Sequence, residues 1–313
     1  MPKTDKAQAE KLGILAGAGR FPVYLAQVAR KKGYRVIVIG PEGRLEPGIE
    51  DHADKVRTYR FARFGELLEV LKEEQIRQAM MAGKFEKRWL YQPGLELDDP
   101  ALAMLKRIPD HQDDTLMNIV LNELTANGIE ILDTISLIQD WLAPAGKLTE
   151  KEPDEKQWQD IRFGWKIAKG IGRLDLGQTV AVLDRAVLAV EAIEGTDQTI
   201  LRAGQISPGA VIVKVLKPGQ SLKYDVPVAG LSTIESMIQA RASVLALEAG
   251  ACLIVEREEM IKLADQNGIC LVGVKVGTKV PRTKRNAHGI ATSAVAKAMA
   301  DKKVARTKRN GKH

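Results

Sequence analysis

The sequence predicts an α/β protein with two domains, and three observations support this prediction. First, strand-sized runs of four or five apolar residues alternate with amphipathic stretches, which is typical of a parallel sheet with helices on both faces. Second, hydrophobic residues make up 45% of the 313 residues, which is enough for a packed core. Third, a stretch rich in proline, glycine and charge interrupts the alternation at residues 143–157.

The first half of the chain shows the alternation most clearly. Apolar runs predict buried strands over residues 12–16, 36–39, 79–82 and 129–132. Helices are expected from Pro22 to Gly33 and over residues 63–74 and 116–127. This order predicts a Rossmann-like N-terminal domain over residues 12–145, with a parallel sheet and helices on both faces, after a polar extension over residues 1–11.

The second half is also α/β but has more hairpin character. A linker is expected over residues 146–157, and a helix over residues 155–170 opens the second domain. Two apolar runs flank Asp184-Arg185 and predict a β-hairpin. Further strands are expected over residues 211–216, 252–255 and 271–274, and helices over residues 233–249 and 257–267. We therefore expect a mixed α/β catalytic domain over residues 158–274.

Composition excludes several classes of protein. Only two cysteines occur, Cys252 and Cys270, which excludes a disulfide-stapled secreted scaffold and a cysteine-based zinc module. Aromatic residues make up 4%, which disfavours a protein that binds single strands by stacking their bases. The polar N-terminus and the lack of any run of ~18–20 apolar residues predict a cytosolic protein without a spanning helix.

Positive charge is concentrated at the C-terminal end. The chain has a net charge of +7, but residues 275–313 hold twelve basic side chains and one acid, a net charge of +11. The 274 residues before them therefore carry −4. This distribution predicts a mildly acidic globular body with a basic, disordered tail, and no nucleic-acid partner is expected. A sharper hypothesis is electrostatic attachment of the tail to the anionic cytosolic face of the inner membrane.

The first predicted strand is followed by a turn that suits a phosphate group. Backbone N–H groups of Gly17, Ala18, Gly19 and Arg20 at this strand–helix junction can hold an anion. The turn also resembles the start of a dinucleotide fingerprint, but Pro22 replaces the third glycine and no acid ends the second strand. A nicotinamide site is therefore disfavoured, and a purely structural turn is the alternative to a phosphate or nucleotide-sugar site.

The densest group of polar residues closes the predicted hairpin. Glu194, Gly195, Thr196 and Asp197 follow an apolar strand, and such hard oxygen ligands suit Mg²⁺, which binds through one or two carboxylates plus substrate phosphates. A solvated loop is the alternative. Lys214 lies inside another apolar strand, where an unpaired ammonium is costly, so we expect a phosphate or a buried carboxylate beside it.

Four weaker motifs complete the candidates. Asp225, close to the rigid Pro227, is positioned to hold a metal ion or to activate water. The others are Gly83-Lys84 at a strand end, where ligands gather in open sheets, the pair Asp114-Thr115, which also suits helix capping, and the turn that ends at Gln178. The four histidines are too few and too isolated to indicate a nucleophile-and-base pair.

Taken in order, these motifs resemble the UDP-2,3-diacylglucosamine diphosphatase family of the LpxI type. The specific part is the run EAIEGTD at residues 191–197 together with KPGQ at residues 217–220. Similar runs are LGILAGAGRFP at 12–22, MAGK at 81–84, DDT at 113–115, DLGQ at 175–178, DVP at 225–227 and EAG at 248–250. The resemblance covers residues 12–274; Ala18 stands where the family often has glycine, and the tail has no counterpart.

The resemblance implies a two-domain enzyme of lipid A biosynthesis. It would use Mg²⁺, or Mn²⁺ as an alternative, and water to split UDP-2,3-diacylglucosamine into UMP and 2,3-diacylglucosamine 1-phosphate (lipid X). The expected catalytic residues are Asp225, Asp197 and Glu194, and Asp225 and Asp197 are also the expected metal ligands. The expected substrate-binding residues are Gly17, Ala18, Gly19, Arg20, Gly83, Lys84, Asp114, Thr115, Gln178, Gly195, Thr196, Lys214, Lys217, Gly219, Gln220 and Thr233.

Two alternative functions from other classes of protein stay open at this point. Assembly into a homodimer also stays open. One is a protein that binds nucleic acid or an acidic partner through its basic tail, which predicts binding that weakens steeply with salt. The other is a nicotinamide oxidoreductase, which the missing third glycine disfavours.

Overall fold

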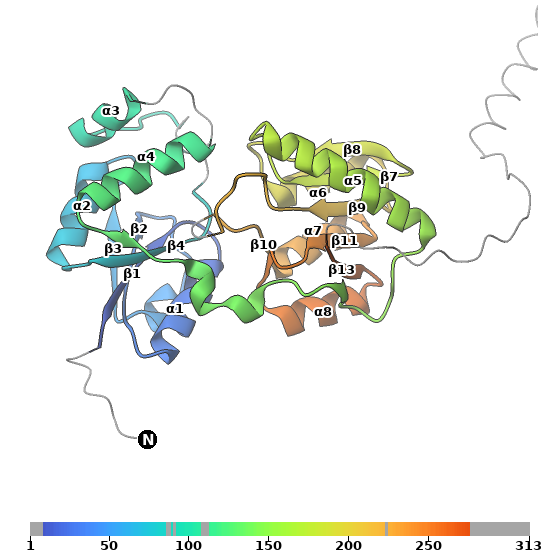
Figure 1. Ribbon diagram of the computed structural model, residues 1–313, viewed down its shortest axis with the longest axis horizontal. Helices are drawn as coiled ribbons and strands as arrows, with labels where there is room; N and C mark the ends of the chain where they lie inside the picture. The colour runs from blue at the N-terminus through green and yellow to red at the C-terminus, as the bar shows by residue number, and fades with distance from the viewer. Residues whose placement is uncertain (1–8, 86–88, 90–91, 108–112, 223–224, 276–313) are drawn as a thin grey trace, which may run out of the picture. The chain divides into compact units, whose positions relative to one another are not determined.

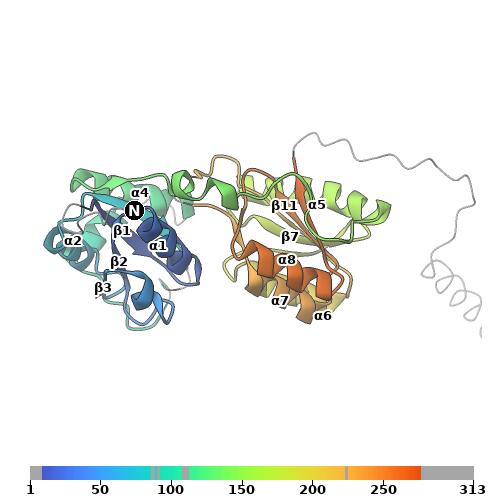
Figure 2. The ribbon, with the colours of Figure 1, turned by 90° about the horizontal axis from the view of Figure 1, so that it is seen from below.

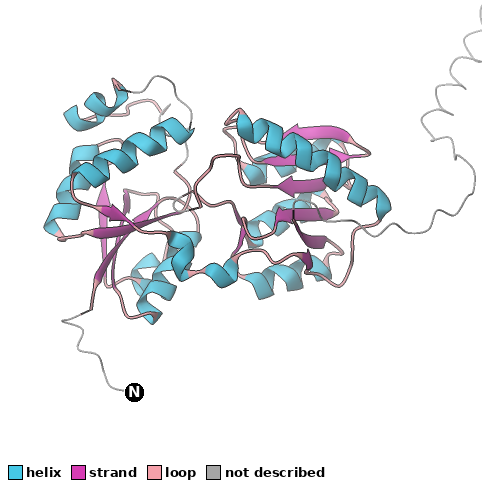
Figure 3. Cartoon of the chain, viewed as in Figure 1, coloured by secondary structure: helices cyan, strands magenta, loops and turns pink. Residues whose placement is uncertain are grey.

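The computed structural model describes residues 9–85, 89, 92–107, 113–222 and 225–275. These residues form a five-stranded sheet, a six-stranded sheet and a two-stranded pair, with helices packed on the two larger sheets (Figure 1, Figure 3). The predicted α/β class is confirmed.

The five-stranded sheet is entirely parallel, in the order β3-β2-β1-β4-β5. Its strands are β1 (Lys11–Ala16), β2 (Arg35–Pro41), β3 (Lys55–Tyr59), β4 (Gln78–Ala82) and β5 (Glu130–Ile131). The strand order reverses between β1 and β4, and ligands of open α/β sheets bind at such a switch point, beyond the carboxyl ends of the strands. The edge strand β3 was not predicted, because its charged and polar residues hide the apolar alternation.

Helices cover both faces of this sheet, as predicted (Figure 1). Leu25 of the first helix packs with Ile14 on one face, and Leu67 and Leu124 of two later helices pack with Leu15 on the other. The two faces alternate along β1 because successive strand side chains point to opposite sides. The helices are α1 (Phe21–Lys31), α2 (Phe64–Glu73), α3 (Asp99–Leu105) and α4 (Asp113–Ala126).

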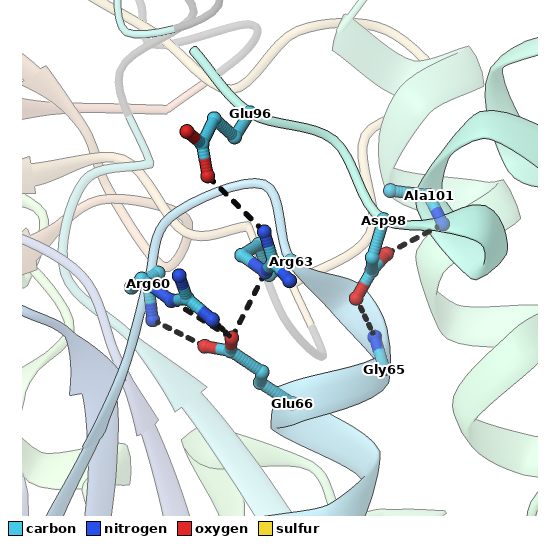
Figure 4. Close-up of polar contacts among 7 residues, drawn as sticks. All are labelled: Arg60, Arg63, Gly65, Glu66, Glu96, Asp98 and Ala101. Atoms are coloured by element: carbon cyan, nitrogen blue, oxygen red, sulfur yellow. Dashed lines mark hydrogen bonds and ion pairs between the residues drawn. The ribbon is translucent and has the colours of Figure 1, made fainter. Parts of the chain in front are cut away.

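A small polar cluster joins the start of α2 to the start of α3 (Figure 4). The carboxylate of Asp98 accepts the N–H of Ala101, which caps α3 at 3.0 Å, and the N–H of Gly65 at 2.8 Å. A Cβ at Gly65 would lie 2.9 Å from the same carboxylate, which explains the glycine. Arg63 adds ion pairs to Glu66 at 2.9 Å and Glu96 at 3.2 Å.

The six-stranded sheet is mixed, in the order β6-β13-β11-β9-β7-β8. Strands β9, β11 and β13 are parallel to one another, whereas β6, β7 and β8 pair in the antiparallel sense. The strands are β6 (Gly146–Lys147), β7 (Thr179–Leu183), β8 (Ala186–Val190), β9 (Val211–Lys214), β11 (Val244–Glu248) and β13 (Cys270–Val274). The separate two-stranded pair is β10 (Val228–Ala229) with β12 (Leu253–Ile254).

One long helix covers one face of this sheet and three helices cover the other (Figure 2). Ile161 of the long helix packs with Val180 and Val213, and Ile200, in the first of the three, packs with Ile212 on the opposite face. The helices are α5 (Glu155–Arg173), α6 (Thr196–Ile206), α7 (Leu231–Ala240) and α8 (Arg257–Gln266). Short 3₁₀ helices span Ile49–His52, Thr134–Leu137 and Gln139–Trp141.

The predicted hairpin is confirmed as β7 and β8. Its turn places Asp184 and Arg185 in the left-handed region, with φ of 51° and 60°. The buried carboxylate of Asp160 accepts both turn N–H groups, at 3.0 and 2.6 Å. This anchor from α5 stabilises a backbone conformation that residues other than glycine rarely adopt.

One predicted element was wrong. The helix expected over residues 233–249 ends at Ala240, and the same stretch then forms strand β11 in the middle of the sheet. Its residues favour helices in isolation, but burial between two parallel neighbours decides their conformation. Arg241, with φ of 53°, ends the helix.

The predicted linker over residues 146–157 is partly regular structure. Gly146 and Lys147 pair with β13, and α5 begins at Glu155 behind a capping box of Asp154 and Gln157. Prolines, glycines and charges resemble a linker in sequence, yet this stretch holds an edge strand. The predicted basic tail lies almost wholly outside the described residues. Among the described residues, no helix is long and apolar enough to cross a membrane.

Candidate functional site

The six-stranded sheet gathers polar side chains at one edge. Because β9 and β11 are parallel and β7 is antiparallel to β9, the ends of β9 and β11 and the start of β7 meet there. The register shows this directly, since Lys214 pairs with Thr179 on one side and Leu247 on the other. The end of β8 lies at the same edge, because Val190 pairs with Val180. Open sheets bind ligands at such an edge.

A buried chain of hydrogen bonds occupies the centre of this edge. Lys214 Nζ donates to Thr196 Oγ1 at 2.7 Å, and Thr196 Oγ1 donates to Glu191 Oε1, also at 2.7 Å. The backbone N–H of Gln178 donates to Glu191 Oε2 at 3.2 Å. Lys214, Thr196 and Glu191 are only 4%, 6% and 8% exposed. The sequence predicts a buried phosphate or carboxylate partner for Lys214. The structure supplies the carboxylate of Glu191, which the hydroxyl of Thr196 links to the Lys214 ammonium.

Glu191 stays ionised despite its burial. Burial alone would raise the pKa of its carboxyl group, because a charge is costly away from water. The positive charge of Lys214 and hydrogen bonds from Thr179, Thr196 and the Gln178 N–H outweigh this effect, and the pKa of Glu191 is lowered. The site therefore holds a buried positive and a buried negative charge, linked by Thr196.

The connection from β8 to α6 places Thr196 at the first turn of a helix. Gly195, with φ of 83°, immediately precedes α6, and a residue with a side chain would be strained there. Glu194 and Asp197 have other partners than the buried chain. Glu194, just before α6, forms an ion pair with Arg202 of that helix. Asp197 lies 3.7 Å from Lys84 Nζ.

A second buried lysine follows in the loop after β9. Lys217 Nζ is 2.5 Å from Asp175 Oδ1 and 4.0 Å from Asp225 Oδ2, and its side chain is 6% exposed. Gln220 accepts the N–H of Lys217 at 3.0 Å and donates to Asp225. Gly219 turns the loop with φ of 89°. The loop thus joins two carboxylates around one buried ammonium.

The turn before β7 packs directly against the end of β8. A Cβ at Gly177 would lie 2.3 Å from the carbonyl oxygen of Glu191, so only glycine allows this approach. The contact brings Asp175 and Gln178 to the same edge as Glu191. The side-chain oxygen of Gln178 is buried and has no hydrogen-bond partner among the described residues, so it can accept a hydrogen bond from a ligand.

At the switch point of the five-stranded sheet, the loops after β1 and β4 pair with each other. Gly17 N–H donates to the carbonyl of Ala82 at 2.8 Å, and Ala18 and Lys84 form an antiparallel bridge. A Cβ at Gly17 would lie 2.5 Å from the carbonyl oxygen of Lys84, and one at Gly83 would lie 2.8 Å from the backbone of Gly17. Contact between the two loops thus requires both glycines; their role in substrate binding stays a prediction.

The remaining predicted residues lie elsewhere. Gly19 has φ of 90° and open space around its Cβ position, and Arg20 forms an ion pair with Glu256 at 2.9 Å. Thr233 is buried in the first turn of α7 and accepts the N–H of Gly230 at 3.5 Å, which is a helix-capping contact. Asp114 and Thr115 belong to the first turn of α4, and their side chains lie outside the described residues.

A magnesium ion was expected at Asp225 and Asp197. Within the described ranges, no three His, Cys, Asp or Glu side chains are grouped so that they could hold a metal ion. Mg²⁺ commonly binds to proteins through only one or two carboxylates and completes its ligands with phosphate oxygens and water. Asp225, whose side chain is 40% exposed beside Lys217, fits that pattern.

Sequence reasoning missed the ion pair of Lys169 with Glu248 at this edge. Lys169 of α5 lies 2.6 and 2.9 Å from the two carboxylate oxygens of Glu248, and the side chains are 21% and 12% exposed. The signal was weak because Glu248 fell inside the wrongly predicted helix. Glu248 was part of a motif, EAG, but Lys169 belongs to no motif.

Two family models together match nearly all of the described chain. The LpxI N-terminal domain matches residues 11–141, and the LpxI C-terminal domain matches residues 144–272. A protein of Caulobacter vibrioides named UDP-2,3-diacylglucosamine pyrophosphatase LpxI is 30% identical over 279 residues, which is 84% of this chain and 97% of that protein.

Solved structures resemble the chain only loosely. A partial consensus L-threonine 3-dehydrogenase is 20% identical, with a TM-score of 0.24, over 47% of this chain and 43% of that one. An N5-carboxyaminoimidazole ribonucleotide synthetase from Thermotoga maritima is 18% identical, with a TM-score of 0.21, over 59% and 42%. Similarity this low supports no argument about the site.

Proposed function

The chain belongs to the LpxI family, and from this premise we propose that it hydrolyses UDP-2,3-diacylglucosamine to UMP and 2,3-diacylglucosamine 1-phosphate. The observation that supports the proposal is the pair of buried lysines, Lys214 and Lys217, at one edge of the six-stranded sheet. An ammonium group suits contact with a phosphate, and the substrate of this reaction carries two adjacent phosphates.

Hydrolysis of a pyrophosphate requires that negative charge is stabilised on both phosphates. Lys214 and Lys217 are held in place by Thr196 and Asp175, so little reorganisation is needed when phosphate arrives. We assign both lysines to phosphate contact. The side-chain oxygen of Gln178, for which the described residues supply no donor, would then accept a hydrogen bond from a hydroxyl or N–H group of the same substrate.

We assign Asp225 to the metal ion and the attacking water. Lys217 and Gln220 contact its carboxylate, which keeps that carboxylate at the edge where the phosphates would lie. Mg²⁺ bound by Asp225 and by phosphate oxygens would neutralise substrate charge and stabilise the leaving group. Asp197, paired with Lys84, is the second candidate ligand, and Glu194 is the second candidate for water activation.

Incubation of the purified protein with UDP-2,3-diacylglucosamine and Mg²⁺ tests the function. We expect UMP and 2,3-diacylglucosamine 1-phosphate in equal amounts, and loss of turnover when EDTA removes the metal ion. If intact lipid substrate yields no UMP, the hydrolase proposal fails.

The Asp225→Ala variant tests the assignment within that function. We expect kcat to fall by about 10³-fold or more with an unchanged circular dichroism spectrum, because the variant lacks the carboxylate that serves metal and water. Turnover like that of the wild type would show that Asp225 is not the catalytic carboxylate.

We further propose that the basic residues 275–313 attach the protein to anionic lipid. Each Lys or Arg near an anionic surface contributes roughly 1 kcal/mol, and this stretch holds twelve of them. Such attachment would bring the enzyme to an amphiphilic substrate. Sedimentation with vesicles of anionic phospholipid should pull down the full chain at low salt but not a chain that ends at Val274. Equal sedimentation of the two would contradict this proposal.

A further inference from the structure

The peptide groups of Leu216, between the two buried lysines, have unusual partners. The N–H of Leu216 donates to Glu248 Oε2 at 2.8 Å, and its carbonyl oxygen accepts from Lys169 Nζ at 2.8 Å. Lys169 and Glu248 also pair with each other. One ion pair thus satisfies both backbone polar groups of a single residue.

The position of Leu216 explains why it needs these partners. The β9–β11 ladder ends where Lys214 pairs with Leu247, and on the other side Val215 still donates to the carbonyl of Gln178 at 3.0 Å. Beyond that point the chain enters the Lys217-Pro218 turn, where strand pairing stops. Backbone groups away from water need partners, and side chains must supply them here.

The two charged residues come from a helix and from the sheet that this helix covers. Lys169 extends from α5, where its ammonium also lies 5.6 Å from the ring centroid of Trp165. Glu248 is the last residue of β11, in the middle of the sheet. The pair is not needed to attach α5, since Gly164 already packs against the side chains of Val213 and Val182.

We propose that Lys169 and Glu248 form a positioning pair that sets the place of Lys217. By holding both polar groups of Leu216, the pair fixes the backbone from which the Lys217 ammonium reaches Asp175 and approaches Asp225. Its kinetic consequence depends on the proposed function, because it acts on catalysis only if Lys217 contacts substrate phosphate. Neither Lys169 nor Glu248 touches substrate in this account.

Kinetics of two variants test the consequence. Glu248→Gln keeps an acceptor for the Leu216 N–H but loses the charge, and Lys169→Met loses the donor to the Leu216 carbonyl. We expect kcat to fall by about 10–100-fold with KM changed by less than about threefold, because a displaced cation matters most where charge develops. Lys169→Arg, which keeps the charge and the donor, should recover most of the loss.

The chain offers a matched control in the exposed pair of Lys147 and Glu152. These side chains are 54% and 63% exposed and lie 3.1 Å apart in the same domain. Lys147→Met and Glu152→Gln should leave kcat and KM unchanged. Wild-type kcat in both Glu248→Gln and Lys169→Met, or an equal loss in the control variants, would overturn the positioning role.

Amide hydrogen exchange tests the pair without any substrate. In Glu248→Met, and in Lys169→Met should the first variant not fold, we expect Leu216 and Gln220 amides to exchange at least about tenfold faster, while core amides of β7 keep their rates. Unchanged exchange at Leu216 would overturn the inference. Because this readout needs no turnover, a wild-type protein that releases no UMP would refute the proposed function and leave the exchange result to decide the positioning pair.

Discussion

The strand-end edges of the two large sheets achieve close packing in different ways. At the switch point of the five-stranded sheet, Gly17 and Gly83 let the loops after β1 and β4 pair backbone to backbone. At the edge of the six-stranded sheet, Lys214 and Lys217 are buried among carboxylates and hydroxyls. At the first edge, the lack of side chains on two glycines allows the loops to approach each other. At the second edge, buried charged side chains pair with one another.

This difference indicates which of the two edges is the better candidate for catalysis. The backbone groups of the two paired loops hydrogen-bond to each other. This pairing explains the glycines of the first edge without any bound ligand. Buried ionised groups are costly, and a pair of well-packed apolar residues often stabilises a fold as well. Buried charged residues are therefore functional candidates, and Lys214, Lys217 and Glu191 lie at the second edge.

Replacing the charge at the second edge should have the largest effect. Lys214→Met leaves Glu191 buried without its counter-charge, so the free energy of unfolding should fall by about 3–5 kcal/mol. The double variant Lys214→Met/Glu191→Gln removes both charges and should recover about 2 kcal/mol. Urea denaturation measures both. A double variant no more stable than Lys214→Met would show that Lys214 and Glu191 are not coupled.

A change of shape at the first edge should cost less. Gly17→Ala puts a Cβ within 2.5 Å of the Lys84 carbonyl oxygen, so the paired loops must separate. We expect a loss of about 3 kcal/mol in the free energy of unfolding. Gly19→Ala meets no neighbour within 4 Å but strains a backbone with φ of 90°, so about 1 kcal/mol is expected. If the two variants are equally stable, loop pairing does not explain Gly17.

Acid should weaken the second edge through Glu191. Its folded pKa lies below the unfolded value of 4.5, so the unfolded chain takes up the proton first and stability falls as the pH drops. Its contribution is complete above the unfolded pKa and is lost as the pH falls through the folded pKa. The stability difference between wild type and Glu191→Gln should therefore shrink as the pH falls below the unfolded pKa of 4.5. A difference that stays constant as the pH falls would contradict the lowered pKa.

The smallest effect concerns the polar cluster at the start of α3. Asp98→Ala removes the cap of α3 and the acceptor for Gly65, and should cost about 1 kcal/mol in the free energy of unfolding. Asp99→Ala, at the next residue, removes only a charge near the helix start and should cost about 0.3 kcal/mol. Equal losses would mean that the Asp98 contacts do not stabilise the domain.

Much of the fold follows from local pattern. Strands β1, β2, β4, β7, β9 and β13 are buried apolar runs, and the Asp184-Arg185 turn joins β7 to the next apolar run, β8. The central strand β11 could not be found in this way, because its sequence VLALE favours a helix until neighbouring strands enclose it. The short strand of residues 146–147 was hidden for the opposite reason, since it exists only through pairing with β13.

The sequence predicts the site where a single residue departs from the pattern of its own strand. Lys214 inside an apolar strand required a partner, and the structure supplies Thr196 and Glu191. The pairing of Lys169 with Glu248 could not be predicted, because it joins residues 79 positions apart on a helix and a strand that the sequence did not place together.

The most direct test of the charged edge is single-turnover release of UMP from UDP-2,3-diacylglucosamine by Lys217→Met. This variant removes one cation from the proposed phosphate site, and the matched variant Lys147→Met removes an exposed one. We predict that release slows by about 100-fold or more in Lys217→Met and keeps the wild-type rate in Lys147→Met. Equal rates in wild type and Lys217→Met, with the fold intact, would contradict the assignment of phosphate chemistry to this edge.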